Sequence, residues 1–330
     1  MNILVLQLKR IGDLILTTPP LVALRQQFPQ ARITLCVHKT CGGLTPAIPF
    51  VDEVLVFQPK GGNLHLWARL ATGSFDVSLD FSETDRSAFF ALLSKAGRRI
   101  AFAKAQKSRL GSLFFNEFVE SSVRENHTVD RNLDLLQPLG IQSRDFPVTL
   151  QVPEPACARV NALLEEAGVR GQYVIVHPGT ARPEKFWVPQ RWAEVIDHCQ
   201  EKLGLPCVVT GTLDPTEKNH VQAIKAAART PICDFSGRLT LLELAAAIQR
   251  AHLLLSMDSA PVHLGAVFGT RQISLFGETN PFHWRPRHNR SAILLAGQDE
   301  PVTEFTPRCI RRPLSDLSTQ AVFNAITSLI

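Results

Sequence analysis

The sequence predicts an α/β protein made of two doubly wound domains, each built on a parallel sheet. Three observations support this prediction. Short strand-like runs alternate with stretches of helical spacing, which is typical of βαβ units. The alternation stops at an extended stretch that contains prolines, and then it starts again. The chain has 330 residues, enough for two cores of ordinary size. A cleft between the two domains is expected.

The first half of the chain begins this alternation. The predicted strands are residues 3–6, 33–37, 53–57, 77–81 and 99–102. Stretches 20–28 and 88–96 between them have helical spacing. Residues 148–155 are extended and contain two prolines, so they are the best candidate for a linker. The first domain is therefore expected to span residues 1–150.

The second half repeats the pattern. Its predicted strands are residues 173–176, 206–210, 231–235, 253–256 and 272–276. They define a second domain over residues 151–314. Residues 315–330 carry apolar side chains at helical spacing, which predicts a terminal helix with one buried face. In a two-domain chain this helix could cross back and brace the first domain.

Composition excludes several classes of protein. With 45% hydrophobic and 20% charged residues, the chain is an ordinary soluble globular protein rather than a disordered, collagen-like or coiled-coil one. The net charge of +5 favours anionic partners but is too small for a dedicated nucleic-acid binder. No nucleic-acid partner is therefore expected.

The cysteines and the hydropathy pattern indicate the cellular compartment. Seven cysteines form no Cys-x-x-Cys pair, which argues against a disulfide framework and a zinc cluster and favours a reducing cytoplasm. The N-terminus lacks the order of a signal peptide, and no apolar run reaches the length of a membrane span. The expected location is the cytoplasm, at most on a membrane surface.

Several common catalytic and cofactor motifs are absent. Neither half has a Gly-x-Gly-x-x-Gly fingerprint, a Walker A lysine loop, a His-Glu-x-x-His motif or a Gly-x-Ser-x-Gly elbow. An Asp-x-Asp pair that could hold a metal on a diphosphate is also missing. Phosphate recognition would therefore rely on backbone amides and cations, and we expect neither a metal nor a cofactor.

The first candidate site follows the first strand, where the chain reads Lys9-Arg10-Ile11-Gly12-Asp13. Gly12 would allow a tight turn at the carboxyl end of the strand. An Asp at that point of an α/β sheet points into the crevice where ligands bind. Alternatively, Asp13 caps the following helix, and this segment alone favours capping over catalysis.

The second candidate site follows the strand at 173–176. A Gly-Thr turn at Thr180 would expose backbone N–H groups, and Arg182 and Lys185 would add cations. Together they could hold a diphosphate without a metal. The alternative is a solvated loop in which Trp187 and Trp192 simply cover the core.

A third segment, residues 256–266, follows another strand. Asp258 and Ser259 lie where helix caps belong, and Pro261 suits a first helical turn. The partial positive charge of this helix N-terminus would therefore point into the same cleft. His263 is either a buried core histidine, the commoner case, or a ligand to phosphate or sugar.

Residues 86–109 form a basic run with seven cations and no acid. Such a run is usually a solvated face. Here it could also meet a phosphorylated or membrane-borne acceptor. The candidate contact residues in the run are Arg98, Arg99, Lys104 and Lys107.

Four stretches together carry a family resemblance. They are ILVLQLKRIGDLILTTPPLVALRQQFP, HTVDRNLDLLQPLGI, IVHPGTARPEKFWVPQRWAEVI and SGRLTLLELAAAIQRAHLLLSMDSAPVHLGAVFGTRQISLFGETNPFHWRP. In this order and spacing they resemble glycosyltransferase family 9, the bacterial heptosyltransferases of the lipopolysaccharide inner core. The segment at 127–133 and the Trp284-Arg285-Pro286 ending look like the third heptosyltransferase, which adds a branching heptose.

The resemblance implies a GT-B fold with two Rossmann-like domains facing a central cleft. The first domain would bind the lipopolysaccharide acceptor, and the second would bind ADP-heptose. The enzyme would work in the cytoplasm, in peripheral contact with the inner membrane, and would transfer heptose with inversion and without a metal.

The resemblance also implies roles for particular residues. The family's catalytic base falls on Asp13 and its diphosphate-binding lysine on Lys185. Its sugar-nucleotide loop falls on the segment from 258 to 263, with Asp258, Ser259, Ala260 and His263. The family usually has Gly where this chain has Ala260, so the backbone approach to the donor would differ.

Three alternatives stay open at this point. A nicotinamide or flavin oxidoreductase could share the architecture, although the glycine fingerprint is missing. The chain could also use another sugar nucleotide or acceptor. A non-catalytic sugar-nucleotide-binding protein would keep the diphosphate site without needing Asp13.

Overall fold

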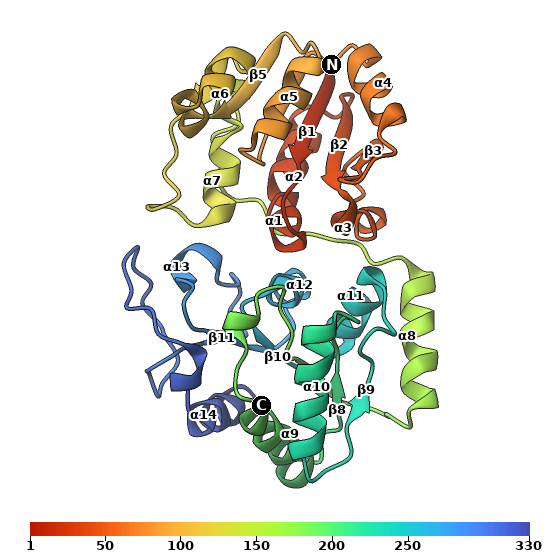
Figure 1. The fold of residues 1–330 in the computed structure, drawn as a ribbon, viewed down its shortest axis with the longest axis vertical. Coiled ribbons are helices and arrows are strands. Elements are labelled where there is room, and N and C mark those ends of the chain that lie inside the picture. The colour runs from red at the N-terminus through yellow and green to blue at the C-terminus, as the bar shows by residue number, and fades with distance from the viewer. The chain divides into compact units, whose positions relative to one another are not determined.

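The computed structural model describes residues 1–330. The chain divides into two compact units, Met1–Gln151 and Val152–Ile330. Each unit contains a six-stranded parallel sheet with helices packed against it (Figure 1). The predicted α/β class with two doubly wound parallel sheets is therefore confirmed, whereas the cleft between them stays a prediction.

The sheet of the first unit has the strand order β3-β2-β1-β4-β5-β6. Its strands are β1 (Asn2–Gln7), β2 (Arg32–His38), β3 (Glu53–Phe57), β4 (Val77–Asp80), β5 (Arg98–Phe102) and β6 (Glu117–Val119). The chain runs outward from β1 in one direction and, after crossing back to β4, in the other. This reversal makes a switch point between β1 and β4, where ligands of doubly wound proteins bind.

Ten helical segments connect these strands. They are α1 (Ile11–Ile15), α2 (Thr18–Gln27), α3 (Lys39–Gly42), η1 (Thr45–Ala47), α4 (Leu64–Thr72), α5 (Asp85–Leu93), η2 (Ala103–Lys107), α6 (Arg109–Phe114), α7 (Thr128–Asp134) and η3 (Gln137–Leu139). Helix α5 packs against both α4 and α6, whereas α2 packs against α7. Because right-handed crossovers leave β1 and β4 in opposite directions, α2 and α5 cover opposite faces of the sheet.

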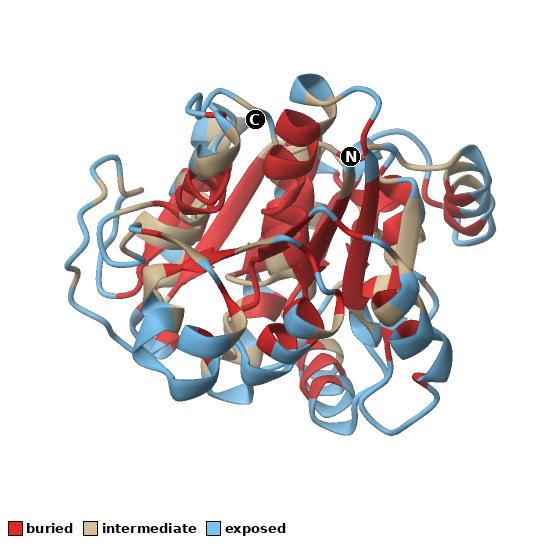
Figure 2. Ribbon diagram, turned by 90° about the horizontal axis from the view of Figure 1, so that it is seen from above, coloured by how far each residue is buried: buried red, intermediate tan, exposed pale blue.

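The core of the first unit explains why its strands are so apolar. Both faces of the sheet are covered, so the strands are buried along most of their length (Figure 2). Under α4 and α5, side chains from β1, β2 and β3, together with Ala101 of β5, meet Leu66, Leu70 and Phe90 of the helices. The side chains from β1, β2 and β3 are Leu4, Leu6, Cys36, Leu55 and Phe57.

The second unit repeats the topology of the first. Its strands are β7 (Val174–His177), β8 (Cys207–Val209), β9 (Cys233–Asp234), β10 (Leu253–Met257), β11 (Gln272–Phe276) and β12 (Ser291–Leu295). Their order, β12-β11-β10-β7-β8-β9, is the order of the first sheet read from the other edge. The switch point of this unit therefore lies between β7 and β10.

Nine helical segments complete the second unit. They are α8 (Glu154–Glu166), η4 (Pro183–Lys185), α9 (Pro189–Leu203), α10 (Pro215–Ala227), α11 (Leu241–Arg250), α12 (Ala260–Phe268), α13 (Pro281–Trp284), η5 (Leu314–Asp316) and α14 (Thr319–Leu329). Trp187 and Trp192 are both fully buried, with their rings edge to face at 5.1 Å. They belong to the core, and Trp187 Nε1 donates to Leu317 O at 3.1 Å.

The terminal helix α14 packs within the second unit. Its buried residues Val322 and Ile326 join the same core as Trp187, and the helix contacts α9, β11 and β12. The expected crossing back to the first domain stays a prediction. The apolar face that the sequence shows is covered by the unit from which the helix emerges.

Two strands and one helix start differ from the sequence prediction. The edge strands β6 and β12 were not expected at all. Helix α8 begins at Glu154, inside the stretch expected to be a linker, because Pro155 fits the first helical turn, where its missing N–H costs nothing. No helix is long and apolar enough to cross a membrane.

Candidate functional site

The loop after β1 is fixed by side chains from both strands at the switch point. Gln7 is buried at the end of β1, and its amide donates to Thr17 Oγ1 at 2.7 Å and accepts from Lys9 N–H at 3.3 Å. From the loop after β4, Ser82 Oγ accepts from Leu8 N–H at 2.7 Å. These bonds hold residues 8–10 and so set where α1 begins.

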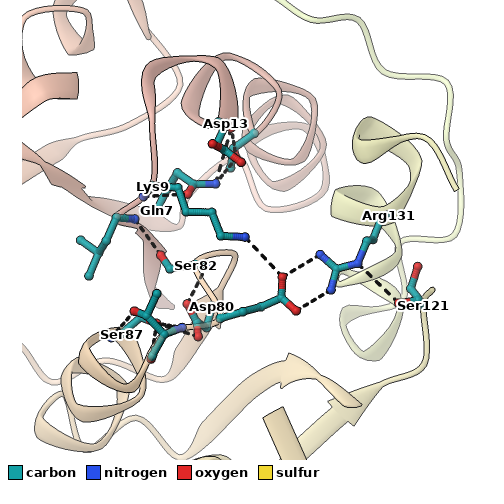
Figure 3. Close-up of polar contacts among 12 residues, drawn as sticks. Gln7, Lys9, Asp13, Asp80, Ser82, Ser87, Ser121 and Arg131 are labelled. Atoms are coloured by element: carbon teal, nitrogen blue, oxygen red, sulfur yellow. Dashed lines mark hydrogen bonds and ion pairs between the residues drawn. The ribbon is translucent and has the colours of Figure 1, made fainter. Parts of the chain in front are cut away.

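Asp13 lies in the first turn of α1 and is half-buried. Its Oδ2 accepts from Arg10 N–H at 3.3 Å (Figure 3). The N-cap position itself belongs to Arg10, so Asp13 is not the N-cap residue but reaches back to it from the third helical position. No hydrogen bond is made to Oδ1, which leaves that oxygen available to a substrate.

The expectation that Gly12 forms the tight turn after the first strand is wrong. The turn after β1 consists of residues 8–10, and Gly12 already lies within α1. Gly12 is not among the glycines with positive φ, so the backbone does not require glycine there for its conformation.

A buried carboxyl, Asp80, lies at the end of β4 beside the same loop. Its Oδ1 accepts from Ser82 N–H at 2.8 Å, and its Oδ2 accepts from Ser87 Oγ at 2.9 Å (Figure 3). Burial raises the pKa of Asp80 to about 6, which these hydrogen bonds and the charge of Lys9 only partly offset.

Glu83 pairs with two cations from distant parts of the first unit. Arg131 of α7 donates to its two oxygens at 2.9 and 2.7 Å, and Lys9 Nζ donates at 3.3 Å. Lys9 and Arg131 thus converge on one point from opposite sides (Figure 3). Burial opposes ionisation of Glu83, but Arg131 and Lys9 outweigh it and lower the pKa.

The Glu83 pairing is buried and costs backbone strain. The side chains of Glu83 and Arg131 are only 10% and 6% exposed, and the Arg131 guanidinium lies 3.5 Å from the centre of the Phe102 ring. Glu83 has a φ of 55°, in the left-handed region that non-glycine residues seldom adopt. The pairing therefore links the β4 loop, the β1 loop and α7 at the carboxyl end of the sheet.

In the second unit, Lys185 and Asp258 form an ion pair across the switch point. Lys185 ends η4 after β7, and Asp258 follows β10, the neighbouring strand. Lys185 Nζ lies 2.6 Å from Asp258 Oδ2, and both side chains are largely buried. The structure thus brings together two predicted site residues that are 73 positions apart.

Helix α12 begins directly after this pair. Ser259 occupies the N-cap position, but its hydroxyl donates to Met257 O at 3.2 Å and caps no N–H group. Ala260 is the first helical residue, and Pro261 follows it. The first turn therefore points N–H groups outward without a side-chain cap, which suits an anion. His263 is buried in the second turn.

The turn after β7 is closely packed against α10. A Cβ on Gly179 would lie 1.3 Å from Glu217 Oε1, so any larger residue would force Glu217 to move. Glu217 Oε2 accepts from Thr212 N–H at 3.1 Å and from the Thr212 hydroxyl. Thr180, the next residue, is half-buried at the mouth of this turn. Glu217 thus supports the loop that carries Thr180 and Lys185.

Two histidines lie behind this turn. His177 Nδ1 is 2.9 Å from Thr210 Oγ1, and His220 stacks on Phe186 at 4.3 Å. Burial lowers the pKa of His177, although Glu217 opposes this, and it lowers the pKa of His220 to about 4. Both rings are therefore neutral near pH 7 and act as packing groups.

Three predicted cations are already engaged. Arg182 is exposed and pairs with Glu184 at 2.8 Å. Arg98 pairs with Glu117 at 2.6 Å and donates to Pro138 O, while Arg99 donates to Phe114 O and Ala96 O. Arg98 and Arg99 thus also hold β5 to its neighbours, and their predicted contact with the acceptor or the membrane stays a prediction. Lys104 and Lys107 of η2 are exposed.

Sequence reasoning missed Asp80, Glu83 and Glu217. Asp80 ends β4, and Glu83 lies in the loop that follows. Their closeness to the β1 loop depends on β4 lying beside β1, and only the strand order of the folded sheet shows this. Arg131 was visible only inside the segment that carries the family resemblance. No group of three or more His, Cys, Asp or Glu side chains is placed to hold a metal ion.

Comparison with known proteins supports a single family. A family model described as glycosyltransferase family 9 (heptosyltransferase) matches residues 63–314. Lipopolysaccharide heptosyltransferase 3 from Escherichia coli is 27% identical over 296 residues, which cover 87% of this chain and 86% of that protein.

Solved structures agree over the whole length. A family 9 glycosyl transferase from Veillonella parvula has a TM-score of 0.86 at 25% identity, covering 99% of this chain and 96% of its own. The E. coli ADP-heptose heptosyltransferase II has a TM-score of 0.81 at 19% identity, covering 100% and 98%. The predicted GT-B type of fold, with two Rossmann-like domains, is thereby confirmed. The family match spans most of the chain, so this protein belongs to glycosyltransferase family 9 and is a glycosyltransferase.

Proposed function

We propose that this chain transfers a heptose from ADP-heptose to the inner core of lipopolysaccharide, with inversion and without a metal ion. The observation that carries the proposal is the Lys185–Asp258 pair beside the uncapped start of α12, at the switch point of the second unit. In a family 9 enzyme this is a site suited to a nucleotide diphosphate. An E. coli relative of the same fold, WaaC, was solved with ADP.

In this proposal Lys185 holds the diphosphate of the donor. Asp258 orients Lys185 in the free enzyme, and the negative charge of the diphosphate supplies a second partner when the donor binds. As the bond between the anomeric carbon and the diphosphate oxygen breaks, charge grows on the leaving ADP. Lys185, the Thr180 turn and the first N–H groups of α12 stabilise that charge.

Asp13 is the proposed general base. Its Oδ1 carries no protein hydrogen bond, so it can accept the proton of the acceptor hydroxyl while the new bond forms at the anomeric carbon. Attack opposite to the leaving group inverts the configuration. General-base assistance of this kind is typically worth about 10²- to 10⁴-fold in rate.

The proposal is tested by product analysis. The purified chain is incubated with a panel of sugar nucleotides and truncated core acceptors, and transfer is followed by mass spectrometry. We expect ADP release only when ADP-heptose and a heptose-containing core acceptor are both present, and an anomeric configuration in the product opposite to that of the donor. If the chain transfers sugar only from a different sugar nucleotide, the proposed donor is wrong. Binding without any transfer would instead favour a non-catalytic sugar-nucleotide-binding protein.

Removing the lysine tests the donor site. Lys185→Ala should weaken ADP binding and slow transfer together, because the charge it offsets exists in the ground state and grows in the transition state. Calorimetry and initial rates measure the two effects, and Lys218→Ala, an exposed lysine on α10, is the control. Activity should survive EDTA. A strict need for added magnesium or manganese would contradict the metal-free scheme.

A further inference from the structure

Six large apolar side chains are exposed on three neighbouring helices of the first unit. They are Leu64 and Trp67 on α4, Phe89 and Leu92 on α5, and Leu110 and Leu113 on α6. Leu64, Trp67 and Leu113 are 79%, 49% and 65% exposed. Because α5 packs against both α4 and α6, the helices that carry them form one continuous layer.

Other side chains of the same helices join the core of the first unit. On α4, Leu66 and Leu70 already face the sheet, and on α5, Ala88, Phe90 and Ala91 do so. The exposed residues lie at the positions between these, so each helix is apolar on its outer side as well. Exposed apolar side chains gathered in this way mark a surface that contacts a partner.

Cations accompany the apolar side chains. Arg86 on α5 and Lys95 just beyond its end flank Phe89 and Leu92 in the sequence. Lys104 and Lys107 lie in η2, and Arg109 lies at the start of α6. All five cations are exposed. None of these five makes an ion pair with a carboxylate. The helices α4, α5 and α6 and η2 contain a single acid, Asp85, at the start of α5.

Mixed apolar, aromatic and cationic character is typical of protein surfaces that rest on an anionic bilayer. Leu, Phe and Trp enter the headgroup region, while Lys and Arg are attracted to anionic lipids. We infer that the surface formed by Leu64, Trp67, Phe89, Leu92, Leu110 and Leu113, with their neighbouring cations, docks the first unit on an anionic membrane. The inference builds on the proposed function, in which the acceptor is carried by a lipid.

Vesicle binding tests the inference without requiring catalysis. The parent protein should co-sediment with vesicles of 30% phosphatidylglycerol in phosphatidylcholine, but not with phosphatidylcholine alone. The variant Leu110→Asn/Leu113→Asn should bind at least about tenfold more weakly, since less apolar area enters the lipid. The vesicle affinity of Lys104→Gln/Lys107→Gln/Arg109→Gln should fall roughly fivefold for each cation removed, and this loss should be smaller at high salt. The matched control is Leu213→Asn/Ile310→Asn, which removes two apolar residues of the second unit that are at least as exposed.

Tryptophan fluorescence gives a second, local readout. Trp187 and Trp192 are fully buried and Trp284 is half-buried, so Trp67 is the most exposed of the four tryptophans. Adding anionic vesicles should shift the emission of the parent to shorter wavelength. Trp67→Phe should abolish the shift.

The outcomes separate this inference from the proposed function. Transfer to a soluble core oligosaccharide without vesicle binding would overturn the membrane surface and leave the function standing. Equal vesicle binding by the Leu110/Leu113 variant and the control would also overturn it. If sedimentation velocity shows a dimer that the same variant dissociates, the surface joins two copies of the chain and the membrane assignment is wrong. Vesicle binding with no transfer would support the surface and contradict the function.

Discussion

Asp13 has one carboxylate oxygen engaged in the fold and the other free. Oδ2 accepts from the Arg10 backbone, and Oδ1 bonds to nothing in the protein. The capping and catalytic interpretations of the sequence are therefore compatible, since each needs a different oxygen. A substitution that keeps the first and removes proton acceptance can separate them.

Asp13→Asn is that substitution. The amide oxygen can still accept from Arg10 N–H, but the amide nitrogen cannot take a proton. Turnover should fall by at least about 10²-fold, while donor affinity and melting temperature stay close to the parent. Steady-state kinetics, donor titration and thermal unfolding measure the three quantities. Should turnover survive while the melting temperature falls, Asp13 is only a capping residue.

Asp80 should make the folding stability depend on pH. Its pKa is about 6 in the folded protein against 3.8 when unperturbed, so the folded state binds the proton more tightly. Protonated Asp80 therefore adds to the free energy of unfolding below about pH 4. This contribution, about 3 kcal/mol in all, is lost as the pH rises through 6. Asp80→Asn keeps an acceptor for Ser82 N–H and removes the titration. The difference in unfolding free energy between parent and variant, measured by urea denaturation from pH 4 to 7, should change in this sense. A flat difference would show that Asp80 is not protonated in the folded state.

At the scale of elements, the sequence predicted ten of the twelve strands, because buried parallel strands are apolar runs between turns. The two that were missed are edge strands. β6 has only three residues, and its first, Glu117, is polar and paired with Arg98. β12 is apolar, but a run of five residues in a long irregular region does not distinguish strand from loop.

Site residues that directly follow a strand could be predicted from the sequence. Site residues whose role depends on side-chain bonds between distant elements could not. Asp13, Lys185 and Asp258 each come after a strand, and the resemblance gave them roles. The bonds of Glu83 to Arg131 and of Glu217 to Thr212 depend on packing between elements. Nothing in the local sequence of Glu83 indicates its partner 48 residues away.

The turn after β7 should tolerate no side chain at Gly179. Gly179→Ala would push Glu217 away and displace the loop that carries Thr180 and Lys185. Overpacking of this kind costs about 1–3 kcal/mol, and ADP affinity should fall with it. In Gly97→Ala the new Cβ lies 3.7 Å from its nearest neighbour, so both quantities should stay at parental values. Normal ADP binding by Gly179→Ala would mean that the turn does not shape the donor site.

At the scale of the whole molecule, two units of equal topology differ in how their cores close. The core cluster of the first unit is formed by side chains between Leu4 and Phe115. The second depends on α14, which buries Ala321, Val322, Ala325 and Ile326 against the sheet and α9. The stability of the second unit should therefore be sensitive to changes in the last eleven helical residues.

Ile326→Ala tests this dependence. Ile326 is fully buried, and shortening it should cost about 2–5 kcal/mol in the unit to which it belongs. Hydrogen exchange followed by mass spectrometry should show faster exchange in β11, β12 and α9, with the first unit unchanged. Phe323→Ala, at a half-buried position of the same helix, should have a smaller effect. Faster exchange confined to the first unit would place the helix there after all.

The position of α14 also orders events during synthesis. Domains fold as units, N-terminal first, while the ribosome is still adding residues. The first sheet can be completed once β6 has emerged, before the second unit is made. The second cannot complete the packing of Trp187, which donates to Leu317, or cover β11 and β12 until α14 has left the ribosome. Until α14 has emerged, the nascent chain carries a completed first sheet and an incompletely covered second sheet, so the second unit should be the more prone to aggregate during synthesis.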